Sequence, residues 1–306
     1  MVKIEPYTEE FEKIYWRLVK EKVSESTRED IVCSSEKFLP KEFWGGAPPA
    51  FKTIILAPFA KLKCARMYIA DPQNFQVMRN ECYQPTGNAL ISSYQELVDA
   101  YEKVADSQQN KSTMRVRIVK SSGLTVCPYC NRDYINCRGE SASGAQLDHF
   151  YEKSDYPVFA LSLYNLVPVC GNCNRMKSKQ NIEFASPFDE TINWENDLIF
   201  HHEASAGSKT RIIVESSHED INNNIENMRI EEAYQIHDTE VEELLEKKRI
   251  YCQTQQQEFQ DVLYKVNVSE QEIKLAVFGP KITKEAMKTK PLSKMMSDLH
   301  KELGIY

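Results

Sequence analysis

The sequence of 306 residues contains no apolar run long enough to cross a membrane. A membrane-spanning helix needs roughly 18 or more apolar residues, and the best candidate, residues 51–60, is short and contains Lys52 and a proline. The first residues, MVKIEPYTEEFEK, have neither an apolar core nor a cleavage site, so we expect no secretory signal. These absences predict a cytoplasmic protein with no membrane partner.

Internal repeats and low-complexity tracts are also absent, as is the phosphate-binding motif G-x-x-x-x-G-K-[ST], so the chain is not itself a P-loop ATPase. Apolar residues make up 42% of the chain and charged residues 27%. This composition is close to that of ordinary globular proteins and excludes a wholly disordered chain. The length predicts about two domains.

The sequence lacks the basic excess that many nucleic-acid-binding proteins have, because 38 Lys and Arg against 45 Asp and Glu give a net charge of −7. The charge is unevenly distributed along the chain. Residues 111–138 contain six basic residues and one acid, Asp133, whereas residues 215–246 contain eleven acids and a single base, Arg229. Each segment is either a solvated face or a functional surface, and the sequence leaves both interpretations open.

Nine cysteines, an odd number, in a chain without an export signal argue against a disulfide framework. Four of them form two C-x-x-C pairs, Cys127 with Cys130 and Cys170 with Cys173, which 39 residues separate. Two such pairs are typical of a tetrahedral Zn²⁺ site with four thiolate ligands. An ordinary zinc ribbon encloses only about 15–20 residues, so we expect a structural zinc ion to close the ends of a larger inserted unit.

The predicted fold class is α+β and mostly helical. Residues 1–120 form a helical N-terminal region, in which Thr8 caps the first helix and the pair Ser93 and Glu96 forms a capping box for another. Residues 121–190 form a small core. Residues 191–306 form a mixed region, with a strand at 211–214 followed by helices that could dock a partner.

Inside the core, the pattern predicts two short strands and a helix. One strand ends at Leu147-Asp148-His149, and the second lies near residues 166–169. The helix follows the second cysteine pair and carries Asn174 and Lys177, three residues apart, close to one face.

This order of residues resembles the HNH endonuclease family and its ββα-metal fold. Asp148-His149 matches the first element of the family motif, Asn165 in NLVP the second, and Asn174 in CNRMK the third. C-x-x-C pairs flank the core in many members. The resemblance covers residues 127–179, and it departs from the family in two respects. Asn174 replaces the third histidine, and Glu152 stands where relatives often carry proline.

The resemblance implies hydrolysis of DNA phosphodiester bonds. His149 is the expected general base, because a neutral imidazole with a pKa near 6.5 suits that role at neutral pH. Asp148 and the amide oxygen of Asn174 are hard ligands for a catalytic Mg²⁺ or Mn²⁺ ion. The resemblance further implies that Asn165 orients His149 and its loop. Lys177 either contacts a phosphate or faces solvent as an ordinary helix lysine.

Residues 231–251 and the motif PLSKMMSDL resemble the C-terminal part of bacterial HNH proteins that are encoded beside an ATPase in anti-phage defence systems such as Septu. This second resemblance implies a nuclease effector whose helical flanks dock an ATPase subunit. Three alternatives stay open. They are a zinc-dependent DNA-binding or scaffold subunit with an inactive nuclease core, an RNA-cleaving toxin, and a purely structural subunit.

Overall fold

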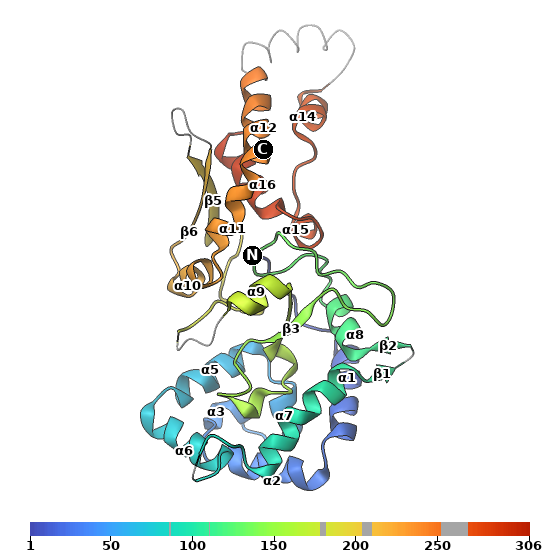
Figure 1. Ribbon diagram of the computed structural model, residues 1–306, viewed down its shortest axis with the longest axis vertical. Coiled ribbons are helices and arrows are strands. Elements are labelled where there is room, and N and C mark those ends of the chain that lie inside the picture. The colour runs from blue at the N-terminus through green and yellow to red at the C-terminus, as the bar shows by residue number, and fades with distance from the viewer. Residues whose placement is uncertain (86, 110, 178–181, 204–209, 252–268) are drawn as a thin grey trace.

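A computed structural model describes residues 1–85, 87–109, 111–177, 182–203, 210–251 and 269–306 of the chain. The described residues form mostly helices and three small two-stranded antiparallel sheets, which confirms the predicted mixed α+β class. Figure 1 shows a helical body at one end, the residues of the predicted core beside it, and an elongated C-terminal lobe at the other end. Among the described helices, none has an apolar stretch that could span a bilayer.

The N-terminal body contains eight helices and a two-stranded hairpin among its described residues. The first helix begins as predicted, because the hydroxyl of Thr8 accepts a hydrogen bond from the backbone N–H of Phe11 at 3.3 Å. The elements are α1 (Glu9–Lys22), α2 (Glu25–Ser35), α3 (Lys41–Trp44), α4 (Phe51–Ile55), α5 (Phe59–Ile69), α6 (Pro72–Cys82), α7 (Ser92–Ala105), β1 (Gln108–Gln109), β2 (Ser112–Thr113) and α8 (Met114–Ser121).

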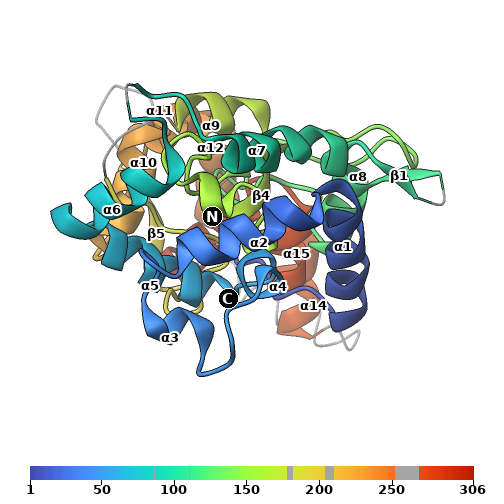
Figure 2. The same cartoon turned by 90° about the horizontal axis from the view of Figure 1, so that it is seen from below.

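The capping box predicted at Ser93 and Glu96 is wrong. The N-cap of helix α7 is Ile91, two residues earlier, and no side chain caps the helix. The carboxylate of Glu96 instead accepts hydrogen bonds from the backbone N–H of Ser24 at 2.9 Å and the hydroxyl of Thr27 at 2.5 Å. These groups lie at the start of α2, which packs against α7 (Figure 2). Glu96, which the local sequence pattern assigned to a helix cap, therefore makes a tertiary contact between α7 and α2 instead.

The predicted core contains a β-hairpin followed by a helix. Strand β3 (Gln146–His149) pairs antiparallel with β4 (Leu166–Val169), so that Asp148 faces Val167 and His149 faces Leu166 across the hairpin. The short 3-10 helices η1 (Pro157–Phe159) and η2 (Leu163–Asn165) lie between the strands. Helix α9 (Gly171–Met176) follows β4 directly. Both predicted strands and the helix are present, but α9 ends at Met176, so the prediction that Lys177 lies on this helix is wrong.

The C-terminal lobe combines a β-hairpin with helices, and the strand predicted at residues 211–214 is part of it. Helix α16 packs against β5. The elements are β5 (Leu198–Glu203), β6 (Arg211–Ser216), α10 (Glu219–Asn227), α11 (Ile230–Tyr234), η3 (Gln235–His237), α12 (Asp238–Ile250), α14 (Glu270–Phe278), α15 (Lys284–Thr289) and α16 (Ser293–Glu302).

The lobe is attached to the core at the turn that carries the first cysteine pair. The hydroxyl of Tyr234 donates a hydrogen bond to the carbonyl oxygen of Cys130 at 2.6 Å. The neighbouring Asn131 is fully buried and accepts hydrogen bonds from two backbone N–H groups at the start of α16, that of Leu292 at 2.7 Å and that of Lys294 at 2.9 Å. The first cysteine turn is therefore also the junction between core and lobe.

Candidate functional site

The two cysteine pairs lie in two separate turns. In the first turn the backbone N–H of Asn131 donates to the carbonyl oxygen of Cys127 at 2.8 Å, and Asn131 has a left-handed backbone with φ of 50°. In the second turn Cys170 is the N-cap of α9, and its sulfur accepts a hydrogen bond from the backbone N–H of Cys173 at 3.4 Å. Both turns are thus fixed by their own backbone hydrogen bonds.

The four cysteine side chains meet in one buried cluster. Their sulfur atoms all lie within 4.8 Å of one another. A tetrahedral site with Zn–S bonds near 2.3 Å places its sulfur atoms about 3.8 Å apart, so the cluster has the size and the ligand chemistry for one Zn²⁺ ion. The predicted candidate metal site of Cys127, Cys130, Cys170 and Cys173 is confirmed as a cluster of four buried thiols.

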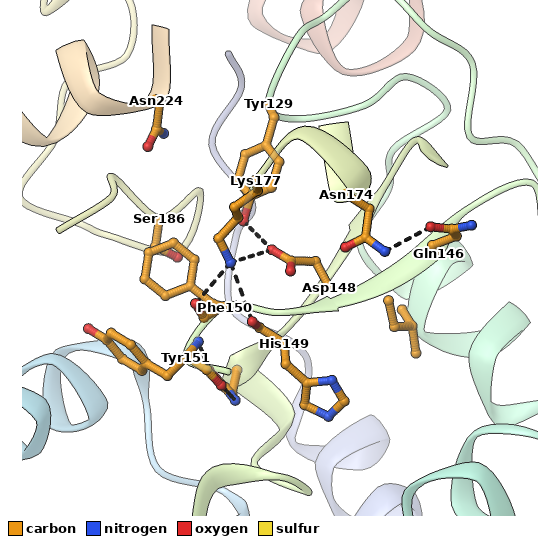
Figure 3. A network of polar contacts seen from close by, with 12 residues as sticks. Tyr129, Gln146, Asp148, His149, Phe150, Tyr151, Asn174, Lys177, Ser186 and Asn224 are labelled. Atoms are coloured by element: carbon orange, nitrogen blue, oxygen red, sulfur yellow. Dashed lines mark hydrogen bonds and ion pairs between the residues drawn. The ribbon is translucent and has the colours of Figure 1, made fainter. Parts of the chain in front are cut away.

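Asp148 lies at the centre of a buried polar network (Figure 3). Its Oδ2 atom accepts hydrogen bonds from the hydroxyl of Tyr129 at 2.7 Å and from Nζ of Lys177 at 2.8 Å. Tyr129 stands between the two cysteines of the first pair, and sequence reasoning gave it no function. Its position in C-P-Y-C could have indicated a function, because a residue inside this turn must lie near the unit that the two cysteine pairs enclose.

Lys177 is enclosed by protein atoms rather than exposed. Its side chain is only 3% exposed, and besides Asp148 its ammonium group donates to the carbonyl oxygens of His149 at 3.3 Å and Phe150 at 2.9 Å. The expectation of a solvent-facing helix lysine is therefore wrong. The ammonium neutralises the Asp148 carboxylate and holds the end of β3, so in this arrangement it is not free to contact a phosphate.

Asn174 lies on the same side of β3 as Asp148. Its Nδ2 donates a hydrogen bond to the side-chain oxygen of Gln146 at 2.7 Å. Gln146 precedes Asp148 by two residues on the strand, so the two side chains share one face. Figure 3 shows the amide oxygen of Asn174 turned toward the Asp148 carboxylate. The two predicted metal ligands thus lie on one side of the strand, and Gln146, which sequence reasoning missed, orients one of them.

His149 points to the opposite side of the strand, as the alternation of side chains along a strand requires. Its Nε2 atom lies 3.0 Å from the carbonyl oxygen of Ala160, and its ring meets that of Tyr101 edge-on with centroids 4.5 Å apart. A carbonyl oxygen can only accept, so Nε2 carries the proton and Nδ1 carries the free electron pair. Burial, aided by the positive charge of Lys153, lowers the pKa of His149 to about 4.

Asn165 is fully buried and closes the loop between the two strands. Its side-chain oxygen accepts from the backbone N–H of Tyr151 at 2.7 Å, and its Nδ2 donates to the carbonyl oxygens of Tyr151 and Phe159, each at 3.0 Å. The loop that these bonds fix contains Ala160, whose carbonyl holds the ring of His149. This arrangement supports the predicted orienting function of Asn165.

Comparisons with protein-family models, with curated proteins and with solved structures find no match for this chain.

Proposed function

We propose that the protein is a metal-dependent endonuclease of the HNH type that hydrolyses DNA phosphodiester bonds. The observation that carries the proposal is the combination of polar groups around the end of β3. Asp148 and Asn174 direct oxygen atoms to one side of the strand, and His149, its last residue, holds a neutral imidazole in a fixed tautomer. A phosphate lying across the end of the strand would meet both.

The oxygen atoms of Asp148 and Asn174 fit a hard divalent cation. Tyr129 and Lys177 both bind Oδ2 of Asp148, and among the described residues neither of these bonds uses Oδ1, which could bind a metal. Gln146 binds the amide nitrogen of Asn174, which leaves its amide oxygen for the same ion. Carboxylate and amide oxygens are preferred ligands of Mg²⁺ and Mn²⁺. A bound ion of this kind would stabilise the negative charge on the phosphate and on the leaving 3′-oxygen.

His149 has the properties of a general base. The imidazole is neutral at pH 7, so its free electron pair on Nδ1 is available to accept a proton from an attacking water molecule. Its pKa of about 4 makes it a weaker base than the ordinary imidazole that the sequence predicts. The hydrogen bond from Nε2 to the Ala160 carbonyl then stabilises the imidazolium that forms. Asn165 contributes indirectly, because it holds the loop that carries this carbonyl.

Conversion of supercoiled plasmid in the presence of Mn²⁺ tests the proposal. We expect the wild type to nick the plasmid and His149→Ala to be at least about 100-fold slower, the lower range for loss of a general base. His218→Ala is the matched control, since His218 lies at the surface with 46% of its side chain exposed. Equal cutting by both variants, at equal zinc content, would contradict the assignment of His149.

Substrate and partner belong to the same proposal and rest on the two resemblances. We propose DNA as the substrate and an ATPase subunit as the partner of the flanking helices, with the nuclease acting as an effector of anti-phage defence. A parallel digest of total RNA separates a DNA endonuclease from an RNA-cleaving toxin. If the isolated chain cuts slowly, adding the ATPase encoded by the neighbouring gene should accelerate wild type but not His149→Ala.

One observation favours a second candidate function, a zinc-dependent scaffold with an inactive core. The buried ammonium of Lys177 already neutralises Asp148, which weakens the attraction of that carboxylate for a metal ion. Titration with Mn²⁺ monitored by electron paramagnetic resonance distinguishes the two functions. The endonuclease requires a bound ion that Asp148→Asn removes, whereas the scaffold binds none beyond its zinc.

A further inference from the structure

A cavity of about 730 Å³ lies beside the end of β3 and shares a wall with the polar network. Among the described residues, Phe150 and Lys177 line this cavity and also belong to the Asp148 network, in which Nζ of Lys177 binds both the Asp148 carboxylate and the Phe150 carbonyl. The volume lies in the range of small-ligand sites. Only the side chain of Lys177 would therefore separate a ligand bound here from Asp148, the proposed metal ligand.

Aromatic rings from separate segments line the cavity. Phe75 comes from α6 at the rim and is 40% exposed. Tyr151 and Tyr156 come from the loop after β3, and Phe184 comes from the segment beyond α9. Rings gathered around a space of this size favour a flat ligand, since every nucleobase has a face that stacks on aromatic side chains.

The charged groups of the cavity argue against a phosphate as its occupant. Two basic side chains and three acidic ones, Glu152, Asp155 and Glu183, line it. The positive charge of each basic side chain is neutralised by an ion pair, that of Arg66 by Glu183 and that of Lys177 by Asp148. A phosphate would meet an excess of negative charge here, whereas an uncharged ring would not.

The ion pair of Arg66 and Glu183 supplies donors and acceptors side by side. A guanidinium group has five N–H donors and a carboxylate has about four acceptor positions, so their mutual contact leaves both able to bind a ligand. The Watson–Crick edge of guanine presents an acceptor, O6, directly beside two donors, N1–H and the N2 amino group. Arg66 can donate to O6 while Glu183 accepts from N1–H and N2–H.

We propose that this cavity binds a guanine base. The identification of that base as part of the nucleic-acid substrate rests on the proposed function, but binding of the base itself does not. Nucleosides contain no phosphodiester bond, so their binding can be measured on the full-length, zinc-loaded protein independently of cleavage.

Isothermal titration with guanosine, inosine and adenosine tests the proposal. Inosine lacks only the N2 amino group, so we expect guanosine to bind roughly tenfold more tightly than inosine, the effect of one hydrogen bond to a charged group. Glu183→Gln should abolish this difference, because an amide offers one acceptor where the carboxylate offers two oxygens. Adenosine, which has an amino group in place of O6, should bind more weakly than guanosine.

Phe75→Ala should weaken guanosine binding at least about fivefold, the lower range for loss of one stacking aromatic ring. Tyr68→Ala is the matched control, because Tyr68 lies nearby at the end of α5, is 43% exposed and does not line the cavity. The proposal is overturned if guanosine shows no saturable binding to the wild type. It is also overturned if Phe75→Ala and Glu183→Gln both bind guanosine as tightly as the wild type does. Guanosine binding without any plasmid cleavage would overturn the proposed endonuclease and leave the guanine site intact.

Discussion

Asp148 and His149 are neighbours in the chain, yet their side chains serve opposite sides of β3. Asp148 belongs to the network of Tyr129 and Lys177, and His149 belongs to the loop that Asn165 closes. The alternation of a strand makes this division unavoidable. For a substrate to use both side chains it must approach the end of the strand, which is where the sequence places the pair.

The residues nearest the proposed chemistry could be predicted from the sequence, because each stands at a fixed spacing within one short segment. The buried environment of Lys177 could not be predicted from the sequence. Its ammonium group shares the Oδ2 atom of Asp148 with Tyr129, which precedes it by 48 residues, and it binds the carbonyl oxygen of His149 at the end of β3. Only the folded hairpin brings these groups together, so a local pattern gave no sign that the lysine neutralises Asp148.

His300 on α16 gives a prediction about acid stability. Both of its ring nitrogens are buried without a hydrogen-bond partner among the described residues, and burial lowers its pKa. In the unfolded chain this imidazole has a pKa near 6.5 and is protonated below that pH. In the folded protein the same group stays neutral to a lower pH. The free energy of unfolding should therefore fall as the pH drops below about 6.5.

We expect His300→Leu to reduce this loss when urea unfolding is compared at pH 8 and pH 5. It should not remove the loss entirely, because His149 also has a lowered pKa and contributes in the same direction. Met67→Leu, at an exposed position without a titratable group, is the control and should leave this loss unchanged. If His300→Leu leaves this loss unchanged, the imidazole takes up its proton equally in the folded and the unfolded protein.

At the scale of elements, the β-hairpin and α9 are each too short to be stable alone. Strands β3 and β4 have four residues each and α9 has six, whereas isolated helices shorter than about 12 residues and two-stranded hairpins are marginal in water. Strands β3 and β4 were predictable because the cysteine spacing and the residue order identified them. The start of α7 could not be predicted, because Glu96 binds α2 instead of capping its own helix.

Removal of zinc should therefore unfold this unit. We expect one zinc ion per chain by elemental analysis, and we expect Cys173→Ser to lose it together with more than about 4 kcal/mol of stability, as is typical when a structural metal is lost. Cys33→Ser, at an exposed cysteine, is the control and should retain both. A zinc-free Cys173→Ser protein with wild-type stability would show that the cluster is not a structural metal site.

At the scale of the whole molecule, the net charge of −7 opposes binding to a polyanion. The proposed binding of DNA must then depend on a local group of basic residues, and each phosphate contact would release counterions from the DNA. We expect the affinity of His149→Ala for duplex DNA to fall at least about tenfold between 50 and 200 mM salt, measured by fluorescence anisotropy. Thermal unfolding at both salt concentrations is the control. Affinity that does not change with salt would contradict an electrostatic DNA interface.

The attachment of the C-terminal lobe at Cys130 and Asn131 has a consequence for modularity. Asn131 is buried, and its amide group satisfies the backbone of α16 while also donating to the carbonyl oxygen of Met287 at 2.7 Å. A chain cut after residue 190 would expose this asparagine and remove the partner of the Cys130 carbonyl. We therefore expect the core and the lobe to unfold as one cooperative unit, and we expect a fragment trimmed to residues 127–179 not to fold by itself.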